Sequence, residues 1–276
     1  MFQISAPRSR LGSAIYIFEL IYHNSVRSVR KTHGNAFMAI LMNMLQTVVF
    51  VMAFYVMFMI LGLRGTAMRG DFMIYIMTGI FLYMTHSKTL GAVSSSEGPA
   101  SPMMQHAPMN TAIAIAAAML STLYIQVLSL AVILFVYDVA FAPGVLLEVF
   151  DPIGCMAMIL LAWFSGAAIG MVFLAAQPWF PTPVGIISTV YQRANMIASG
   201  KMFVANTLPS YMLTMFDWNP LFHCIDQSRG YAFLDYNPRN SSWEYALYLS
   251  IVLLMIGLMG EFYTRKHASA SWGARR

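Results

Sequence analysis

Charged residues are scarce in this sequence. They make up 10% of the 276 residues, whereas 59% of the residues are hydrophobic. A soluble domain carries about 25% charged residues, so the depletion excludes an ordinary water-soluble domain and indicates that lipid surrounds much of the chain. Three long segments hold no charged residue, and each exceeds the roughly 20 apolar residues that cross a bilayer: Phe37–Leu63, Thr111–Tyr137 and Pro152–Pro178.

The sequence also has only two cysteines, and no secretory signal is expected. The two cysteines, Cys155 and Cys224, stand in apolar sequence and are expected to be packing residues, so they give no disulfide framework. The first 36 residues are basic and contain no short apolar core, so no secretory signal is expected there. The net charge of +5 comes mainly from two basic tails, which indicates membrane orientation and not nucleic-acid binding.

The sequence contains no nucleotide-binding loop. Its only Gly-Lys pair, Gly200-Lys201, is followed by Met202, and Asn195 stands where a phosphate loop needs a glycine. The chain is therefore not expected to hydrolyse ATP or to hold a cofactor. His223 and Asp226 stand three residues apart and are compatible with a metal or acid–base pair, but two ligands without a third favour a polar lining. No metal site is expected.

The apolar segments predict an all-α integral membrane protein. Residues 1–36 form a cytoplasmic tail in which Leu11–Lys31 reads as an amphipathic helix lying in the headgroup plane, with an ordinary docked helix as the alternative. Residues 37–263 form a six-span transmembrane domain, and residues 264–276 form a basic tail. The expected spans are Phe37–Leu63, Phe72–Val93, Thr111–Tyr137, Ile153–Ala176, Val184–Ala205 and Tyr245–Tyr263.

The distribution of basic residues predicts the orientation. Nine of the sixteen Lys and Arg residues lie in the two tails, whereas the loop Asp138–Asp151 holds three acids and no base. Because cytoplasmic segments are enriched in Lys and Arg, both tails are expected inside, which agrees with an even number of spans. Arg64 and Arg69 in the loop Arg64–Asp71 break this rule.

The segment "LPSYMLTMFDWNPLFHCIDQSRGYAF", residues 208–233, is apolar but too short to cross twice. Its halves, Ser210–Asn219 and Leu221–Phe233, would be about 15 and 20 Å long as helices, against a hydrocarbon core of about 30 Å. Asn219 is a good N-cap and Pro220 suits the first helical position. The sequence therefore predicts a re-entrant helical hairpin over residues 209–233, with an external amphipathic loop as the alternative.

Two cations lie within the expected fifth span. Arg193 and Lys201 are eight residues apart, so they fall on roughly one helical face, and intramembrane charge usually faces a cavity or a partner. In the alternative, the span is shorter and Lys201 lies in the outer headgroups. Asp217, Asp226 and Arg229 of the hairpin are expected to face water or one another.

This arrangement resembles the permease subunits of ABC-2 type exporters, specifically those that export capsular polysaccharide or O-antigen. The resemblance covers nearly the whole chain and is most specific in the hairpin. There the pattern is a leucine-proline, an asparagine-proline-leucine, and a helix with an acid and an arginine: Leu208, Pro209, Asn219, Pro220, Leu221, Asp226 and Arg229. The richness in methionine and the sequence "QPWFPTP" between spans four and five depart from the family pattern.

The resemblance implies a homodimer in the bacterial inner membrane, with separate ATPase subunits and a channel for a lipid-linked glycan. The segment Ser94–Asn110 would match the family's cytoplasmic coupling and gating element, with Glu97, Gln105 and His106 expected near the ATPase. Aromatic rings offer flat apolar faces to sugars. The expected substrate path holds Arg193 and five aromatic residues, Tyr211, Phe216, Trp218, Phe222 and Tyr231.

Other interpretations stay open. Without the resemblance, anchoring at the membrane interface is the first explanation for the aromatic residues of the hairpin. An ABC-2 permease for drugs or small lipids would share the whole architecture. A membrane-embedded enzyme that modifies lipids would need a cluster of His, Asp and Glu, which only His223 and Asp226 approach.

Overall fold

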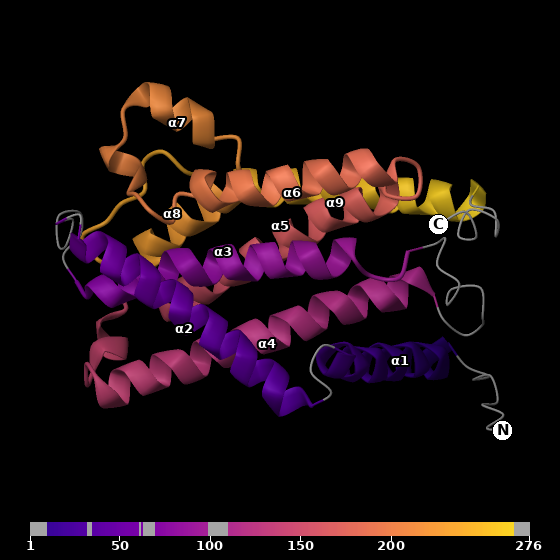
Figure 1. Cartoon of the computed structure of the whole chain (residues 1–276), viewed down its shortest axis with the longest axis horizontal. Helices are drawn as coiled ribbons and strands as arrows, with labels where there is room; N and C mark the ends of the chain where they lie inside the picture. The colour runs from indigo at the N-terminus through magenta and orange to yellow at the C-terminus, as the bar shows by residue number, and fades with distance from the viewer. Residues whose placement is uncertain (1–9, 32–34, 61, 63–69, 99–109, 268–276) are drawn as a thin grey trace.

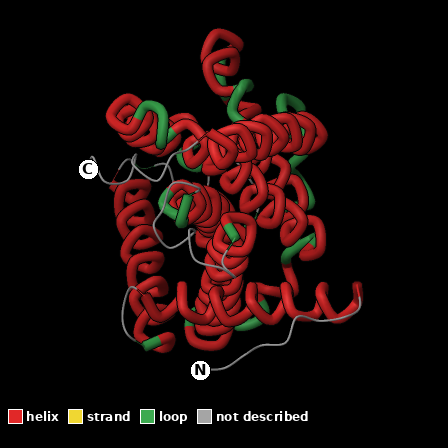
Figure 2. Tube along the Cα trace, turned by 90° about the vertical axis from the view of Figure 1, so that its right-hand side faces the viewer, coloured by secondary structure: helices red, strands yellow, loops and turns green. Residues whose placement is uncertain are grey.

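The computed structural model describes residues 10–31, 35–60, 62, 70–98 and 110–267. This part of the chain contains nine α-helices, two 3₁₀ helices and no strand (Figures 1 and 2). The elements in chain order are α1 (Arg10–Lys31), α2 (Ala36–Ile60), α3 (Phe72–Ser94), α4 (Thr111–Ala140), η2 (Val145–Glu148), α5 (Pro152–Ala176), α6 (Pro181–Ala198), η3 (Ala205–Thr207), α7 (Ser210–Phe216), α8 (Pro220–Ala232) and α9 (Trp243–His267).

Side-chain caps set the beginnings of several helices. Asp71 accepts a hydrogen bond from the Ile74 N–H, and Asn110 accepts one from the Ala112 N–H. Asp151 accepts from two backbone N–H groups at the start of α5, whose first residue is a proline. Each cap satisfies a donor that the helix itself leaves free, so these short polar residues place the ends of otherwise apolar segments.

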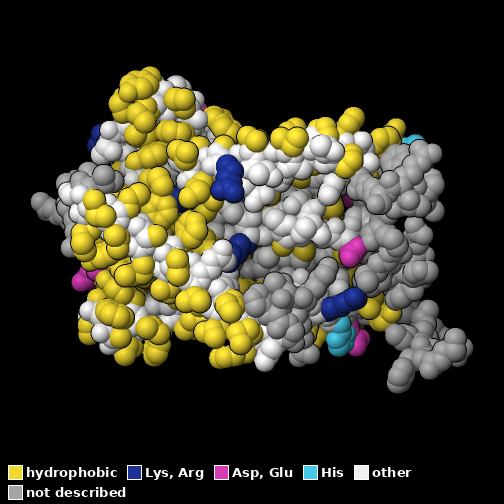
Figure 3. Space-filling model, in the orientation of Figure 1, with side chains coloured by type: hydrophobic (Ala, Val, Ile, Leu, Met, Phe, Trp, Pro, Cys, Tyr) yellow, Lys and Arg dark blue, Asp and Glu magenta, His cyan; other side chains and the backbone are white. Residues whose placement is uncertain are grey.

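Among the described residues, four helices are long and apolar enough to cross a membrane. They are Phe37–Ile60 in α2, Thr111–Ala140 (α4), Pro152–Ala176 (α5) and Trp243–His267 (α9). Hydrophobic side chains cover much of the surface on the face shown in Figure 3. The chain is therefore a helical membrane protein. The two other expected spans correspond to α3 and α6, which do not meet the same criterion, so the count of six spans stays a prediction.

Helix α5 forms the centre of the bundle. Inside the molecule, 67% of its most apolar window is buried, against 22–28% for α2, α4 and α9. Glycines let its neighbours approach closely: a Cβ on Gly166 of α5 would lie 2.4 Å from the carbonyl oxygen of His86 in α3. A Cβ on Gly257 of α9 would lie 2.7 Å from the Met171 Cβ of α5. Backbone-to-backbone contact thus joins α3, α5 and α9, as is common between membrane helices.

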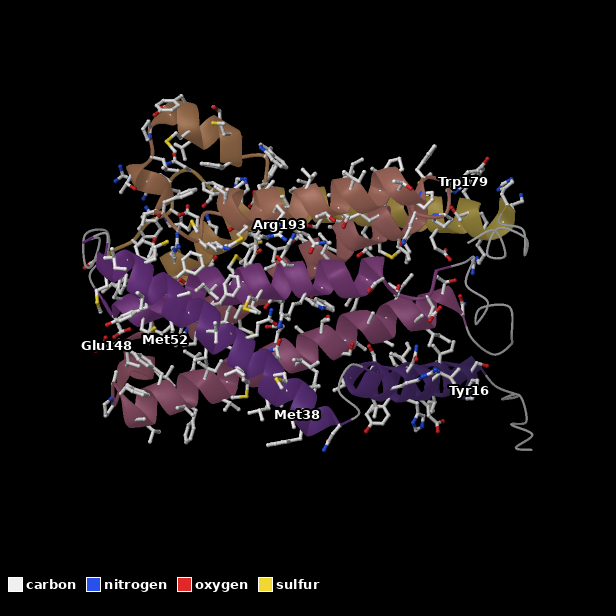
Figure 4. All side chains as sticks on the ribbon, in the orientation of Figure 1. Tyr16, Met38, Met52, Glu148, Trp179 and Arg193 are labelled. Atoms are coloured by element: carbon white, nitrogen blue, oxygen red, sulfur yellow. The ribbon has the colours of Figure 1, made fainter. Side chains whose placement is uncertain are left out.

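The bundle has two ends. We call the first the Trp179 end, where α5 ends, α6 begins and α9 ends. There the Trp179 indole N–H donates to Thr264 Oγ1 of α9 at 2.7 Å. At the second, the Asp151 end, α3 begins, α4 ends and α5 begins. There the Tyr137 hydroxyl donates to Asp71 Oδ2 at 2.9 Å, and the Asp151 N–H donates to the Tyr231 carbonyl at 2.8 Å. Figure 4 labels Trp179 and Glu148 at these opposite ends.

Candidate functional site

The segment between α6 and α9 folds as two short helices that meet at Asn219-Pro220. Helix α7 ends at Phe216 and α8 begins at Pro220, so the predicted break and cap are confirmed. Asn219 Oδ1 accepts from the Leu221 N–H at 3.1 Å, while its Nδ2 donates to Asn195 Oδ1 at 2.6 Å and to the Ala198 carbonyl at 3.1 Å. One side chain therefore caps α8 and fixes the hinge to the end of α6.

Arg229 of α8 holds the turn that follows α6. Its guanidinium is 1% exposed and donates to the carbonyls of Gly200, Lys201 and Phe203 at 2.6–2.9 Å. The Tyr75 ring lies 4.3 Å from the Arg229 Cζ. A planar fork of donors suits several acceptors at once, so Arg229 ties α8 to the 200–203 turn and to α3.

Asp226, also in α8, holds the segment that leads to α9. Its Oδ1 accepts from the Tyr236 hydroxyl at 2.5 Å and its Oδ2 accepts from the Ser241 hydroxyl at 2.7 Å. Burial, and then the Asp226 carboxylate, raise the pKa of the Tyr236 phenol, so it donates as a neutral hydroxyl. The expectation that Asp226 and Arg229 face water or each other is wrong. Both are buried. Asp226 accepts from two hydroxyl groups, whereas the Nη1 and Nη2 groups of Arg229 donate to backbone carbonyls.

His223 joins the hinge to the start of α9. Its Nε2 lies 2.6 Å from the Asp217 carbonyl oxygen, and its Nδ1 lies 3.0 Å from the Ser242 backbone nitrogen. A carbonyl needs a donor and an N–H needs an acceptor, so the ring is the neutral tautomer with its proton on Nε2. Both nitrogens of His223 thus have structural partners. No group of three His, Cys, Asp or Glu residues suited to a metal occurs among the described residues.

The aromatic residues expected along a substrate path differ in their exposure. Tyr211 and Trp218 are 70% and 51% exposed, on and just after α7. Phe216 is half-buried, with its ring centroid 5.1 Å from that of Phe203, and Tyr231 is half-buried against α5. Phe222 is 1% exposed and is packed inside the folded chain, so its ring offers no face to a substrate path.

The two cations expected on one face of the fifth span lie in different surroundings. Helix α6 ends at Ala198, so Lys201 belongs to the turn that follows, whereas Arg193 is exposed on α6 (Figure 4). Lys201 is buried, and its Nζ lies 3.3 Å from the centroid of the Tyr83 ring and 5.2 Å from that of Phe54. No local pattern predicts this cation–π site, because its rings come from α2 and α3.

The remaining predicted residues concern the coupling segment. Glu97 follows α3 and is half-buried, beside Gly98, whose added Cβ would lie 3.4 Å from a Leu174 methyl carbon. Glu97 therefore lies at the Trp179 end of the bundle. Gln105 and His106 lie outside the described residues.

Comparison with known proteins leaves the family open. No protein-family model matches the chain, and no curated protein matches it.

Proposed function

We propose that the chain is the permease subunit of an ATP-driven exporter that moves a lipid-linked polysaccharide, of capsule or O-antigen type, through a dimeric channel. The observation that carries the proposal is the difference in exposure between α7 and the polar residues of the hinge and α8. Helix α7 has no buried residue and presents Tyr211, while Trp218 follows it. Beneath it, Asn219, Asp226 and Arg229 form a buried polar scaffold. Aromatic side chains held out on a rigid base suit a surface over which a glycan slides.

The contacts of α8 support a re-entrant hairpin. Its last turn hydrogen-bonds to residues 150–151 at the Asp151 end, and its first turn adjoins Asn195 of α6. Thirteen residues separate these contacts by about 20 Å along the helix. Before α7, Asn206 Nδ2 donates to the Asn237 carbonyl at 2.8 Å. In this proposal the chain leaves the outer loops through α7, turns at the hinge within the membrane and returns through α8.

Helices α3 and α6 complete six spans in this proposal. Helix α3 packs along α5, and its 23 residues give a length of about 34 Å, enough for the hydrocarbon core. Helix α6 begins at the Trp179 end and runs about 27 Å toward the opposite end. Six crossings place both basic tails on the same side, the cytoplasm. A capsule or O-antigen exporter belongs in the bacterial inner membrane.

The outer face of α6 supports a dimer. Only Asn195 of this helix is buried, and Ile186, Ile187 and Val190 are all exposed. On α7, Tyr211 is exposed as well. Two copies that face each other through α6 and α7 would enclose a passage lined by apolar faces. ATP would be hydrolysed by separate subunits at the Trp179 end, where Glu97 lies.

A lipid-modifying enzyme has less support, because the hydrogen bonds of His223 and Asp226 go to structural partners. A permease for drugs or small lipids would use the same helices. The cargo of such a permease is not a polymer that must be threaded. Removal of the exposed aromatic rings therefore distinguishes the two functions, because only polymer export should need these rings.

Affinity purification from the native membrane tests the proposal. The tagged full chain is solubilised and captured, and the eluate is assayed for ATP hydrolysis and for a second, untagged copy of the chain. We expect a stoichiometric ATPase subunit and a dimer, and we expect glycosyltransferase genes beside the gene for this chain. A monomer that elutes without any ATPase under conditions that preserve other exporters would overturn the proposal.

A further inference from the structure

A polar pocket opens between the first four helices, on the half of the bundle away from the hairpin. It has a volume of about 350 Å³ and receives residues from α1, α2, α3 and α4. Its polar lining residues are Ser28, Asn43, Gln46, Lys88, Thr122 and Gln126. A pocket of this character is unusual in an otherwise apolar bundle, because polar groups within membrane sequence are costly and are usually functional.

A hydrogen-bond network fixes the geometry of this pocket. Asn43 Nδ2 donates to Ser129 Oγ at 2.8 Å, so Asn43 Oδ1 is turned toward α3 and α4. This oxygen accepts from Gln126 Nε2 at 3.2 Å and from the Lys88 ammonium. Asn43, Ser129 and Gln126 are all buried. The Lys88 side chain is therefore tethered in place before any ligand arrives.

The charge of Lys88 is not balanced. Lys88 forms no ion pair with any of the eleven Asp and Glu residues of the sequence, all of which the structure describes. An ammonium group has three N–H donors, and the hydrogen bond to Asn43 uses one of them. Two donors and a full positive charge remain beside the pocket. An anion that binds there would form charge-assisted hydrogen bonds, the stronger kind.

The depth of the pocket identifies where such an anion comes from. Lys88 lies sixteen residues after Phe72, about 24 Å along α3, and Asn43 lies seventeen residues before Ile60, about 26 Å along α2. Both distances approach the 30 Å thickness of the hydrocarbon core. The pocket therefore lies close to one headgroup layer, where lipid phosphates are found.

The sequence of the adjoining helix is basic toward its end. Helix α1 supplies Ser28 to the pocket, and the sequence of its last two turns contains Arg27, Arg30 and Lys31. Clusters of Lys and Arg at a membrane surface attract anionic lipids.

We infer that this pocket binds the phosphate group of an anionic lipid, with Lys88 as the residue that contacts the phosphate. Two lipids carry the required chemistry, a bilayer phospholipid and the phosphate-linked lipid anchor of a glycan. The inference needs only that α2, α3 and α4 lie in a membrane, so it holds or fails independently of the export proposal.

The test measures lipid retained by the full chain. Wild type, Lys88→Gln, Lys88→Arg and Arg193→Gln are placed in phosphatidylcholine nanodiscs that contain some phosphatidylglycerol, and the bound lipid is identified by native mass spectrometry. Lys88→Gln keeps a donor for Asn43 but removes the charge. Arg193→Gln removes an exposed charge of α6 outside the pocket. Thermal unfolding without phosphatidylglycerol shows that each variant is folded.

We expect wild type, Lys88→Arg and Arg193→Gln to retain phosphatidylglycerol in preference to phosphatidylcholine. In folded Lys88→Gln this preference should weaken at least tenfold, about 1.4 kcal/mol. Equal retention by wild type and Lys88→Gln would overturn the inference. So would displacement of the lipid by an equal concentration of inorganic phosphate, because the site would then take a free anion. Displacement by a polyprenyl phosphate would identify the glycan anchor as the ligand, and its failure would identify the bilayer phospholipid.

Discussion

Replacement of Arg229 should loosen the hairpin from the rest of the bundle. The guanidinium donates to three backbone carbonyls in the 200–203 turn and stacks on Tyr75. In Arg229→Met the side chain keeps much of its length but offers no donor, so the three carbonyls lose a partner in a buried place. Arg229→Lys keeps the charge but replaces a planar fork with a point charge.

The expected losses follow from the burial of this contact. Loss of the partner of a buried acceptor costs roughly 1–3 kcal/mol. Because Arg229→Met leaves three carbonyls without this partner, we expect it to lose about 3 kcal/mol or more of the free energy of unfolding. Arg229→Lys should lose about 1–3 kcal/mol, because the ammonium reaches only some of the carbonyls. Arg239→Ala, at an exposed residue between α8 and α9, should stay within about 0.5 kcal/mol of wild type.

The free energies are measured by SDS titration in mixed micelles, together with amide hydrogen exchange. Global destabilisation alone would speed exchange everywhere, whereas loss of the Arg229 contact should speed exchange first in residues 199–204. A free energy for Arg229→Met within about 0.5 kcal/mol of wild type, with unchanged exchange in that turn, would refute the reasoning.

Three further changes test other parts of the structure. Lys201→Met should leave the SDS-derived free energy of unfolding unchanged or raise it, because an apolar side chain of similar size avoids the desolvation of a buried ammonium; a loss above about 2 kcal/mol would contradict this account. Gly166→Ala should lower the thermal midpoint, since overpacking costs about 1–3 kcal/mol, whereas Gly91→Ala, whose Cβ would meet no atom within 4 Å, should not. Tyr211→Ala with Trp218→Ala should preserve folding and dimerisation but reduce glycan at the cell surface; normal surface glycan would argue against a path along α7.

The elements that sequence located best are those with strong local signals. The expected start of the third span at Thr111 coincides with that of α4, since Asn110 caps it. The hinge is also where it was predicted, because Asn219 and Pro220 act within one turn of chain. Such signals need no knowledge of the partners that a helix meets in space.

The partners of the charged side chains could not be predicted in the same way. Asp226 and Arg229 are three residues apart and oppositely charged, so sequence favours mutual pairing, but the fold brings Tyr236 to one and the 200–203 turn to the other. The rings around Lys201 come from helices more than a hundred residues earlier. Long-range packing decides these contacts, and the spacing of residues along the chain does not predict it.

The sequence indicates the residues of the polar pocket less clearly than it indicates the helix caps and the hinge. Lys88 near the end of a predicted span reads as a snorkelling side chain. Asn43 and Gln126 are polar residues in two largely apolar spans. Only the crossing of α2, α3 and α4 brings the three together, and this crossing depends on helix tilt, which composition does not set.

Export itself is the central claim, and the cell-surface glycan measures it most directly. In cells that lack this chain, the account predicts that lipid-linked polysaccharide accumulates on the cytoplasmic side and disappears from the surface. The wild-type chain should restore surface glycan only when its partner ATPase is active. Surface polysaccharide that is unchanged after deletion, with no intracellular accumulation, would contradict the account.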